Sequence, residues 1–262
     1  MVIRYLKNLV VLAVVATAFH GSAAVNAAEW GSIKGRFVVD GTAPEPPALD
    51  TSKDAFCSDK KPTNQSLVIG KDNSLVNAVV YLRVPTGKKV EINPEYAAKL
   101  QEPAILDNSG CSFHPHILMV RVGQPFIIKN SDPVGHNTKA SLVANGQFNV
   151  TVAAGQETKT PITKAESLPL PVNCNIHPFM EGHLLVQDHP YMAVSGDDGS
   201  FEIKDIPAGK QEFQLWHEAS GYLKNLKFKG GVTDRRGRAE LTIPAGQTLD
   251  LGDIKVPASG LK

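Results

Sequence analysis

The sequence carries little net charge, and it lacks the short motifs of several large enzyme classes. Among 262 residues, 27 are Lys or Arg and 26 are Asp or Glu, which gives a formal net charge of +1. Such a balance does not predict nucleic acid as a partner, because nucleic-acid binding is driven by an excess of basic side chains. The sequence contains no Gly-x-Ser-x-Gly elbow, no His-Glu-x-x-His pair and no phosphate-binding glycine loop. We therefore expect the protein not to be an enzyme.

Long apolar runs are absent except near the amino terminus. There, an apolar run over residues 9–19 follows the basic residues Arg4 and Lys7 and precedes small residues that continue to Ala28. This order predicts a cleavable signal peptide over residues 1–28, since the run is shorter than the ~20 residues that span a bilayer. The mature chain is then exported, to the periplasm or beyond, without a transmembrane segment. An uncleaved anchor is the alternative.

Segments of helix-forming composition are also scarce, and residues 94–100 are the one example. Glycine (22) and proline (18) are frequent, and the apolar segments are short, which is typical of β-sandwiches. About 234 residues remain after the signal peptide, enough for one large all-β domain or two small ones. The expected strands lie at residues 33–40, 67–69, 76–84, 117–122, 125–130, 148–152, 182–187, 213–218, 241–243 and 249–256.

One short stretch gathers three donors that suit a copper ion. Cys174, His177 and Met180 supply a thiol, an imidazole and a thioether within seven residues. A blue copper site needs two imidazoles and a thiolate near one plane, with a weak axial thioether. The second imidazole must come from elsewhere, and His136 is the best candidate because it follows the strand expected at 125–130. Both groups of donors would then lie at strand ends, where a sheet can hold them rigidly.

The loop Cys-x-x-His-Pro-Phe-Met-x-Gly resembles the copper-binding loop of the amicyanins, which belong to the cupredoxin family. The pair His136-Asn137 is similar to the segment that supplies the first histidine in that family, and the resemblance covers about residues 115–188. It implies a cupredoxin-like Greek-key sandwich with one mononuclear copper site, and single-electron exchange with a redox protein such as a dehydrogenase or a c-type cytochrome. The implied copper ligands are His136, Cys174, His177 and Met180, and Asn137 would help to fix the thiolate through its amide.

The resemblance also assigns a role to each donor. Cys174 would be the equatorial thiolate, His136 the inner imidazole, His177 the outer imidazole near the surface, and Met180 the axial donor. The Pro-Phe pair after His177 would belong to an apolar patch on which a redox partner docks. Two other functions stay open, namely copper binding or storage in the cell envelope, and a structural envelope module that carries no electrons.

The pattern changes from Tyr191 onward. An Asp-Gly-x-Phe turn, a short strand, a Pro-x-Gly turn and an alternating strand follow one another, in an order that resembles the carboxypeptidase regulatory-like, or transthyretin-like, β-sandwich. Turn chemistry alone explains this motif, so it implies no catalytic residue. We therefore expect a signal peptide at 1–28, a cupredoxin-like copper domain with an N-terminal extension at 29–190, and a second, smaller β-sandwich at 191–262.

The chain has three cysteines, and assigning Cys174 to copper leaves Cys57 and Cys111. In an oxidising compartment two remaining thiols are expected to form a disulfide. The alternative is that Cys111 joins His114 and His116 in a second metal site.

Three further histidines give weaker signals. His183 follows Met180 closely, but a residue on a strand is equally well placed to face solvent. His189 and His217 are expected to be packed or hydrogen-bonded at the junction of the two parts of the chain.

Overall fold

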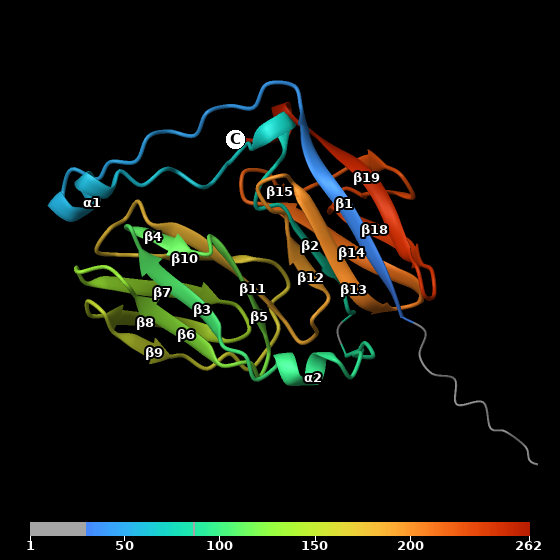
Figure 1. The fold of residues 1–262 in the computed structure, drawn as a ribbon, viewed down its shortest axis with the longest axis horizontal. Helices are drawn as coiled ribbons and strands as arrows, with labels where there is room; N and C mark the ends of the chain where they lie inside the picture. Colours follow the sequence, from blue (N-terminus) through green and yellow to red (C-terminus); the bar gives the residue numbers. More distant parts are fainter. Residues whose placement is uncertain (1–29, 86) are drawn as a thin grey trace, which may run out of the picture.

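The computed structural model describes residues 30–85 and 87–262, which form two β-sandwiches lying side by side (Figure 1). The fold class is all-β, as the sequence predicts, and the two α-helices of the described residues are short: α1 (Ala55–Lys60) and α2 (Tyr96–Lys99). Neither has the length and apolar character needed to span a bilayer. The expected signal peptide lies outside the described residues.

The first sandwich, here called the central sandwich, is built from the middle of the chain. One sheet has the strand order β5-β11-β10-β7-β8 and the other the order β4-β3-β6-β9. Strands β5 and β11 run parallel, as do β3 and β6, so the chain crosses over between them. The strands are β3 (Ala104–Ser109), β4 (Ser112–His114), β5 (Ile117–Arg121), β6 (Phe126–Asn130), β7 (His136–Leu142), β8 (Gly146–Val152), β9 (Glu157–Lys159), β10 (Leu170–Asn173) and β11 (Glu181–Gln187).

The second sandwich, here called the terminal sandwich, combines strands from both ends of the described chain. Its sheets have the orders β13-β1-β19 and β12-β2-β14-β15, with β18 also pairing β14. A small hairpin, β16 (Lys227–Phe228) and β17 (Gly231–Val232), adjoins it. The strands are β1 (Trp30–Asp40), β2 (Val79–Leu82), β12 (Met192–Val194), β13 (Ser200–Pro207), β14 (Gly209–His217), β15 (Gly221–Tyr222), β18 (Arg238–Ile243) and β19 (Thr248–Pro257).

This pairing differs from the expected division at residues 29–190 and 191–262. Strand β1 lies between β13 and β19, and β2 lies between β12 and β14, so the N-terminal extension belongs to the terminal sandwich. The physical reason is that β1 and β2 fill places between C-terminal strands whose backbone groups need partners on both sides. The expected strand at 67–69 is only an isolated bridge between Ile69 and Leu75.

Successive side chains of a strand point to opposite faces of its sheet, and this explains how the two sandwiches pack against each other. On β11, Leu184 and Val186 point into the core of the central sandwich, while Leu185 points the other way. Leu185 meets Ile117 of β5, and both pack with Val79 and Trp216 from the terminal sandwich. Strand β11 is therefore buried on both faces, and an apolar interface joins the two sandwiches.

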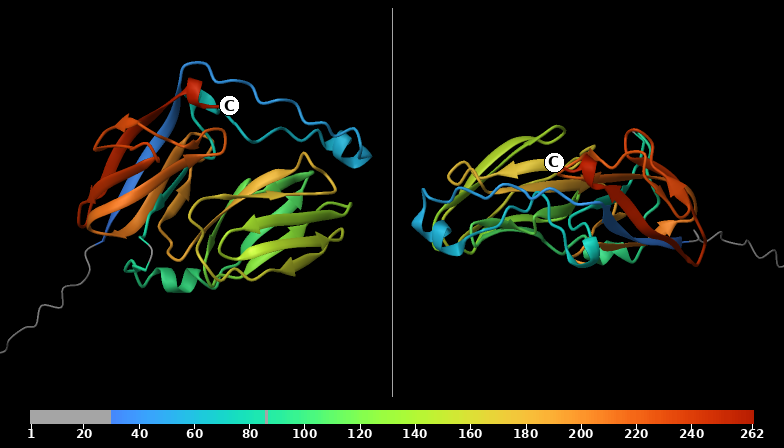
Figure 2. Two further views of the ribbon diagram at one scale, coloured as in Figure 1. Left: turned by 180° about the vertical axis from the view of Figure 1, so that it is seen from behind. Right: turned by 90° about the horizontal axis from the view of Figure 1, so that it is seen from above.

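A long connection leaves the terminal sandwich after β1, crosses to one end of the central sandwich and returns to β2 (Figure 2). We call residues 41–66 of this connection the arm. The arm carries α1, whose first turn is capped by Asp54, because Oδ1 of Asp54 accepts from the N–H of Cys57 at 2.9 Å. A disulfide between Cys57 and Cys111 fastens α1 to the turn between β3 and β4, with 5.5 Å between the two Cα atoms. The predicted disulfide is thus confirmed.

Candidate metal centre

The loop between β10 and β11 holds the Cys174, His177 and Met180 triad of the sequence pattern. Its backbone closes on itself, because the N–H of Cys174 donates to the carbonyl of Met180 at 3.2 Å and the N–H of Met180 donates to the carbonyl of His177 at 2.9 Å. Since β10 and β11 are antiparallel neighbours, both ends of the loop are fixed by the sheet. Cys174 and Met180 are each 1% exposed and belong to the core of the central sandwich.

His136 reaches the same place from a different connection. It is the first residue of β7 and follows the segment that crosses from β6 to the other sheet. The side chain of Asn130 shapes this segment by donating to the carbonyls of Val134 and Val152, at 2.8 and 3.0 Å, and by accepting from the N–H of Asp132 at 3.0 Å. The imidazole of His136 is fully buried. The expectation that this histidine lies at a strand end is confirmed.

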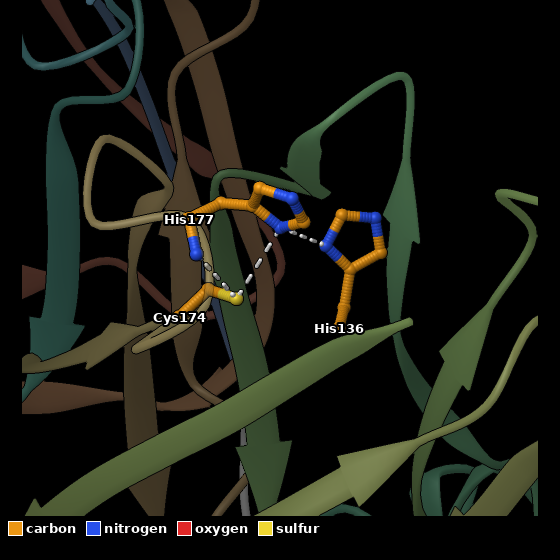
Figure 3. Close-up of side chains that lie close together, drawn as sticks. All are labelled: His136, Cys174 and His177. Atoms are coloured by element: carbon orange, nitrogen blue, oxygen red, sulfur yellow. Dashed lines mark hydrogen bonds between the residues drawn. The ribbon is translucent and has the colours of Figure 1, made fainter. Parts of the chain in front are cut away.

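Three donor atoms converge between the two connections (Figure 3). Nδ1 of His136 lies 2.9 Å from Nδ1 of His177, and Nδ1 of His177 lies 3.8 Å from Sγ of Cys174. The donor atoms of all three residues lie within 4.8 Å of one another, and all three residues are buried. Cys174 is in no disulfide, so its sulfur is free to act as a ligand.

Carboxylates on the far sides of both rings set which nitrogens face the cluster. Nε2 of His136 lies 2.9 Å from Oδ2 of Asp132, and Nε2 of His177 lies 3.4 Å from Oδ2 of Asp54. Each carboxylate favours a proton on the nearby Nε2, which leaves the Nδ1 lone pair toward the cluster. Burial lowers the pKa of His136 below its usual value, although the hydrogen bond to Asp132 acts in the opposite direction.

These residues fit a cationic ligand. Two neutral imidazoles whose Nδ1 lone pairs face each other at 2.9 Å repel unless a cation or a proton lies between them. The nearby sulfur adds a third donor, and two imidazoles with one thiolate are the donor set that copper takes in blue copper sites. Backbone hydrogen bonds keep Met180 beside Cys174 and His177.

Asn137 holds the loop through both its backbone and its side chain. Its N–H donates to Sγ of Cys174 at 3.4 Å, as does the N–H of His177 at the same distance. Its Oδ1 accepts from the N–H groups of Asn175 and Ile176, at 2.7 and 3.1 Å. Two N–H groups are thus aimed at one sulfur, and they fix its position in the loop. The amide of Asn137 fixes the loop around the sulfur, whereas its own N–H contacts the sulfur directly.

Sequence reasoning missed the two carboxylates that orient the histidines. Asp132 lies only four residues before His136, so this spacing could have drawn attention to it. Besides orienting His136, Asp132 accepts from the N–H groups of Gly110 and Cys111, at 2.7 and 2.9 Å. Asp54 belongs to the arm, and no local pattern links it to the copper loop.

His177 is not at the surface, in contrast to the expectation for the outer imidazole. Its exposure is 4%, because the arm lies over it and brings Asp54 against Nε2. The remaining opening is a pocket of about 350 Å³ between the arm and the loop, lined by Asp50, Lys53, Asp54, Ile176, His177, Pro178 and Phe179. The neighbouring Ile176 is 52% exposed, so the apolar patch of the loop extends to this residue.

The alternative second site of Cys111, His114 and His116 is not formed. The sulfur of Cys111 is bonded to Cys57, and the side chain of His114 is exposed on β4. His116 instead turns toward His183 and Glu218, at the interface of the sandwiches.

His189 and His217 are hydrogen-bonded to the backbone, as expected. Nε2 of His189 lies 2.9 Å from the carbonyl oxygen of Leu82, and Nε2 of His217 lies 3.0 Å from that of Val76. These contacts hold both histidines against β2 of the terminal sandwich or against the residues just before it.

Comparison with solved structures finds partial similarity to copper proteins. A copper-containing nitrite reductase from Thermus scotoductus SA-01 matches at 20% identity over 40% of this chain and 25% of its own, with a TM-score of 0.30. A purple cupredoxin from Nitrosopumilus maritimus matches at 21% identity over 32% of this chain and 98% of its own, with a TM-score of 0.27. Amicyanin from Paracoccus versutus matches at 16% identity over 41% of this chain and 97% of its own, with a TM-score of 0.29.

All three matches have TM-scores of 0.30 or less, and the chain spans about a quarter of the length of the nitrite reductase. No protein-family model matches the sequence, and the search of curated proteins found no match.

Proposed function

We propose that this protein is an exported blue copper protein that carries single electrons between redox partners in the cell envelope. His136, Cys174, His177 and Met180 would hold one copper ion. In this proposal the protein is a carrier and not an enzyme, and the terminal sandwich is its accessory domain of carboxypeptidase regulatory-like type.

One observation carries the proposal: the buried convergence of two Nδ1 atoms and one sulfur from two separate connections of the central sandwich. Copper bound there would supply a one-electron couple. Imidazoles suit both of its oxidation states, and thiolate and thioether favour the reduced one. Asp132, Asp54 and Asn137 hold the rings and the sulfur in place without copper, so a change of charge requires little movement of the protein.

Location and partners follow from the same proposal. The signal-peptide pattern at residues 1–28 supports export to the periplasm, and the Cys57–Cys111 disulfide fits an oxidising compartment. The partner would be a redox protein such as a dehydrogenase or a c-type cytochrome. It would dock on the exposed Ile176 and the adjoining Pro178 and Phe179, which lie next to His177 in the chain.

The test is to add Cu²⁺ to the purified mature protein and record its visible spectrum. We expect intense absorption from charge transfer between thiolate and copper, at one copper per chain. The Cys174→Ser variant should lose this absorption, whereas Ser141→Ala, a change on the exposed side of β7, should retain it. A wild-type protein that binds copper at this loop without the intense absorption would contradict the proposal.

A second function, copper storage, is favoured by the burial of His177. The arm leaves this imidazole 4% exposed, and a covered ligand suits retention of the ion better than rapid electron exchange. Electron self-exchange of the copper-loaded protein separates the two, because a carrier exchanges rapidly and a storage protein does not.

A further inference from the structure

A second group of side chains of metal-ligating types lies at the interface of the two sandwiches, and it shares no residue with the proposed copper ligands. His116 precedes β5 and His183 lies on β11, so both belong to the central sandwich. Glu218 follows β14 directly and belongs to the terminal sandwich. Their donor atoms lie within 4.8 Å of one another. The interface therefore brings together two imidazoles and one carboxylate that are distant in the sequence.

The three side chains are largely buried, and the contacts among them satisfy only part of their hydrogen-bonding capacity. His116 and His183 are 7% and 8% exposed, and the side chain of Glu218 is 13% exposed. Nε2 of His116 donates to Oε2 of Glu218 at 2.5 Å. Nδ1 of His183 lies 3.5 Å from the same oxygen but makes no hydrogen bond, although it is buried. A buried nitrogen without a partner is unfavourable, so its retention here needs an explanation.

We propose that His116, His183 and Glu218 form a second metal site, for a divalent transition metal ion of the Zn²⁺ or Cu²⁺ kind. An ion bound between the three side chains would give Nδ1 of His183 the partner that it lacks. Two imidazoles and one carboxylate are a donor set that proteins use for zinc. The set has no sulfur, so it suits divalent ions better than the reduced copper that the Cys174 loop favours.

The spacing of the donors requires only a small adjustment. Ligands about 2.1 Å from a tetrahedral ion lie roughly 3.4 Å apart, and the His183–Glu218 separation of 3.5 Å already matches this value. The His116–Glu218 pair would have to open by roughly 1 Å. Glu218 follows the last residue of β14 and lies in a turn closed by the bond from Ser220 N–H to the His217 carbonyl, at 3.1 Å, so it is not held by strand pairing on both sides.

The site has an opening through which an ion and a fourth ligand can enter. A pocket of about 190 Å³ reaches His116 and Glu218 and is also lined by Glu181 and by Ser66 of the arm. A zinc site with three protein ligands keeps its remaining position for water or another small ligand. The bound ion would also tie the central sandwich to the terminal one, since its ligands come from both.

The test compares zinc binding by four proteins: wild type, His183→Gln, Glu218→Gln and His114→Gln. Native mass spectrometry after Zn²⁺ loading should show one zinc fewer in the first two variants than in wild type. His114→Gln is the control, because this histidine is exposed nearby on β4 and should leave the zinc count unchanged. The copper loop is intact in all four proteins, so its own metal binding cancels in the comparison. Equal zinc counts in wild type and His183→Gln would overturn the proposal.

A second measurement needs no variant. A crystal of the wild-type protein soaked with Zn²⁺ should give an anomalous peak between Nε2 of His116 and Nδ1 of His183. A saturating soak that leaves this position without a peak would also overturn the proposal, whatever the copper loop binds.

Discussion

Oδ2 of Asp54 lies 3.4 Å from Nε2 of His177, so a carboxylate of the arm contacts a proposed copper ligand from outside the central sandwich. The contact depends on two further links. The disulfide at Cys57 fastens the arm to the turn before β4, and the N-cap of α1 fixes the backbone at Asp54. The orientation of the His177 ring is thus set partly by a segment that leaves the other sandwich.

Replacing Asp54 with asparagine should weaken copper binding without unfolding the arm. Asparagine can still cap α1, but it removes the negative charge that favours a proton on Nε2 of His177. Loss of such a partner typically lowers metal affinity by about 10- to 100-fold, and we expect about tenfold because the contact is partly exposed. Competition with a chromophoric chelator measures the change. Asp50→Asn is the control, because Asp50 lies on the same arm and accepts from Ser52 instead.

Removing the disulfide should destabilise the protein and release the arm. Cys57 and Cys111 are 54 positions apart, and the chain-entropy estimate for a loop of this length is about 4 kcal/mol. The Cys57→Ser, Cys111→Ser double variant should therefore lose about 4 kcal/mol of unfolding free energy in denaturant titrations. A thiol assay on the denatured, unreduced wild type should detect one thiol, that of Cys174. Three thiols would contradict the disulfide.

A charge on the apolar patch of the copper loop should slow electron self-exchange. Ile176 is 52% exposed, and Ile176→Asp would place like charges opposite each other when two copies meet at this patch. About 1.4 kcal/mol of repulsion gives a tenfold slower rate, and we expect at least this effect. Ile176 is a cleaner position than Phe179, which is half-buried against the central core.

The matched control for that experiment is Val143→Asp. Val143 is 79% exposed and follows β7 at its end opposite to His136, so the added charge lies far from the copper loop. NMR line broadening in mixtures of oxidised and reduced protein measures the exchange. Equal slowing by both variants would show that the loop patch is not the contact surface.

The stability of the protein should fall as the pH drops from about 6.5 toward 4. Burial lowers the pKa of His189 from 6.5 to about 4 in the folded state, so the unfolded chain binds a proton first. A proton on Nδ1 of His189 would break the bond that this atom accepts from the N–H of Tyr191 at 3.1 Å. Each such histidine contributes a slope of about 1.4 kcal/mol per pH unit in this window.

Denaturant titrations between pH 6 and 4.5 measure that slope. We expect His189→Gln to reduce it by about 1.4 kcal/mol per pH unit, even if the variant is less stable at every pH. A slope that is the same in variant and wild type would mean that His189 is not protonated on unfolding.

Most of the candidate centre could be predicted from the sequence, because most of its residues lie close together in the chain. The disulfide could be predicted from the number of cysteines. Cys174, His177 and Met180 lie in one short loop, and a loop between two antiparallel strands keeps its residues together whatever surrounds it. His136 was found because it follows a recognisable strand. Cys57 and Cys111 could be paired because only two cysteines remained once Cys174 was assigned to metal.

The tertiary structure alone decided which distant segments meet. Alternating apolar residues in β1 and the continuous apolar run of β2 show that both strands have surface to bury, but not that their partners are β13, β19, β12 and β14 at the other end of the chain. The same holds for Asp54 on His177, and for Glu218 between His116 and His183. Spacing along the chain fixes which side chains share a strand face or a loop, whereas contacts across sheets depend on strand pairing and domain packing that no short pattern records.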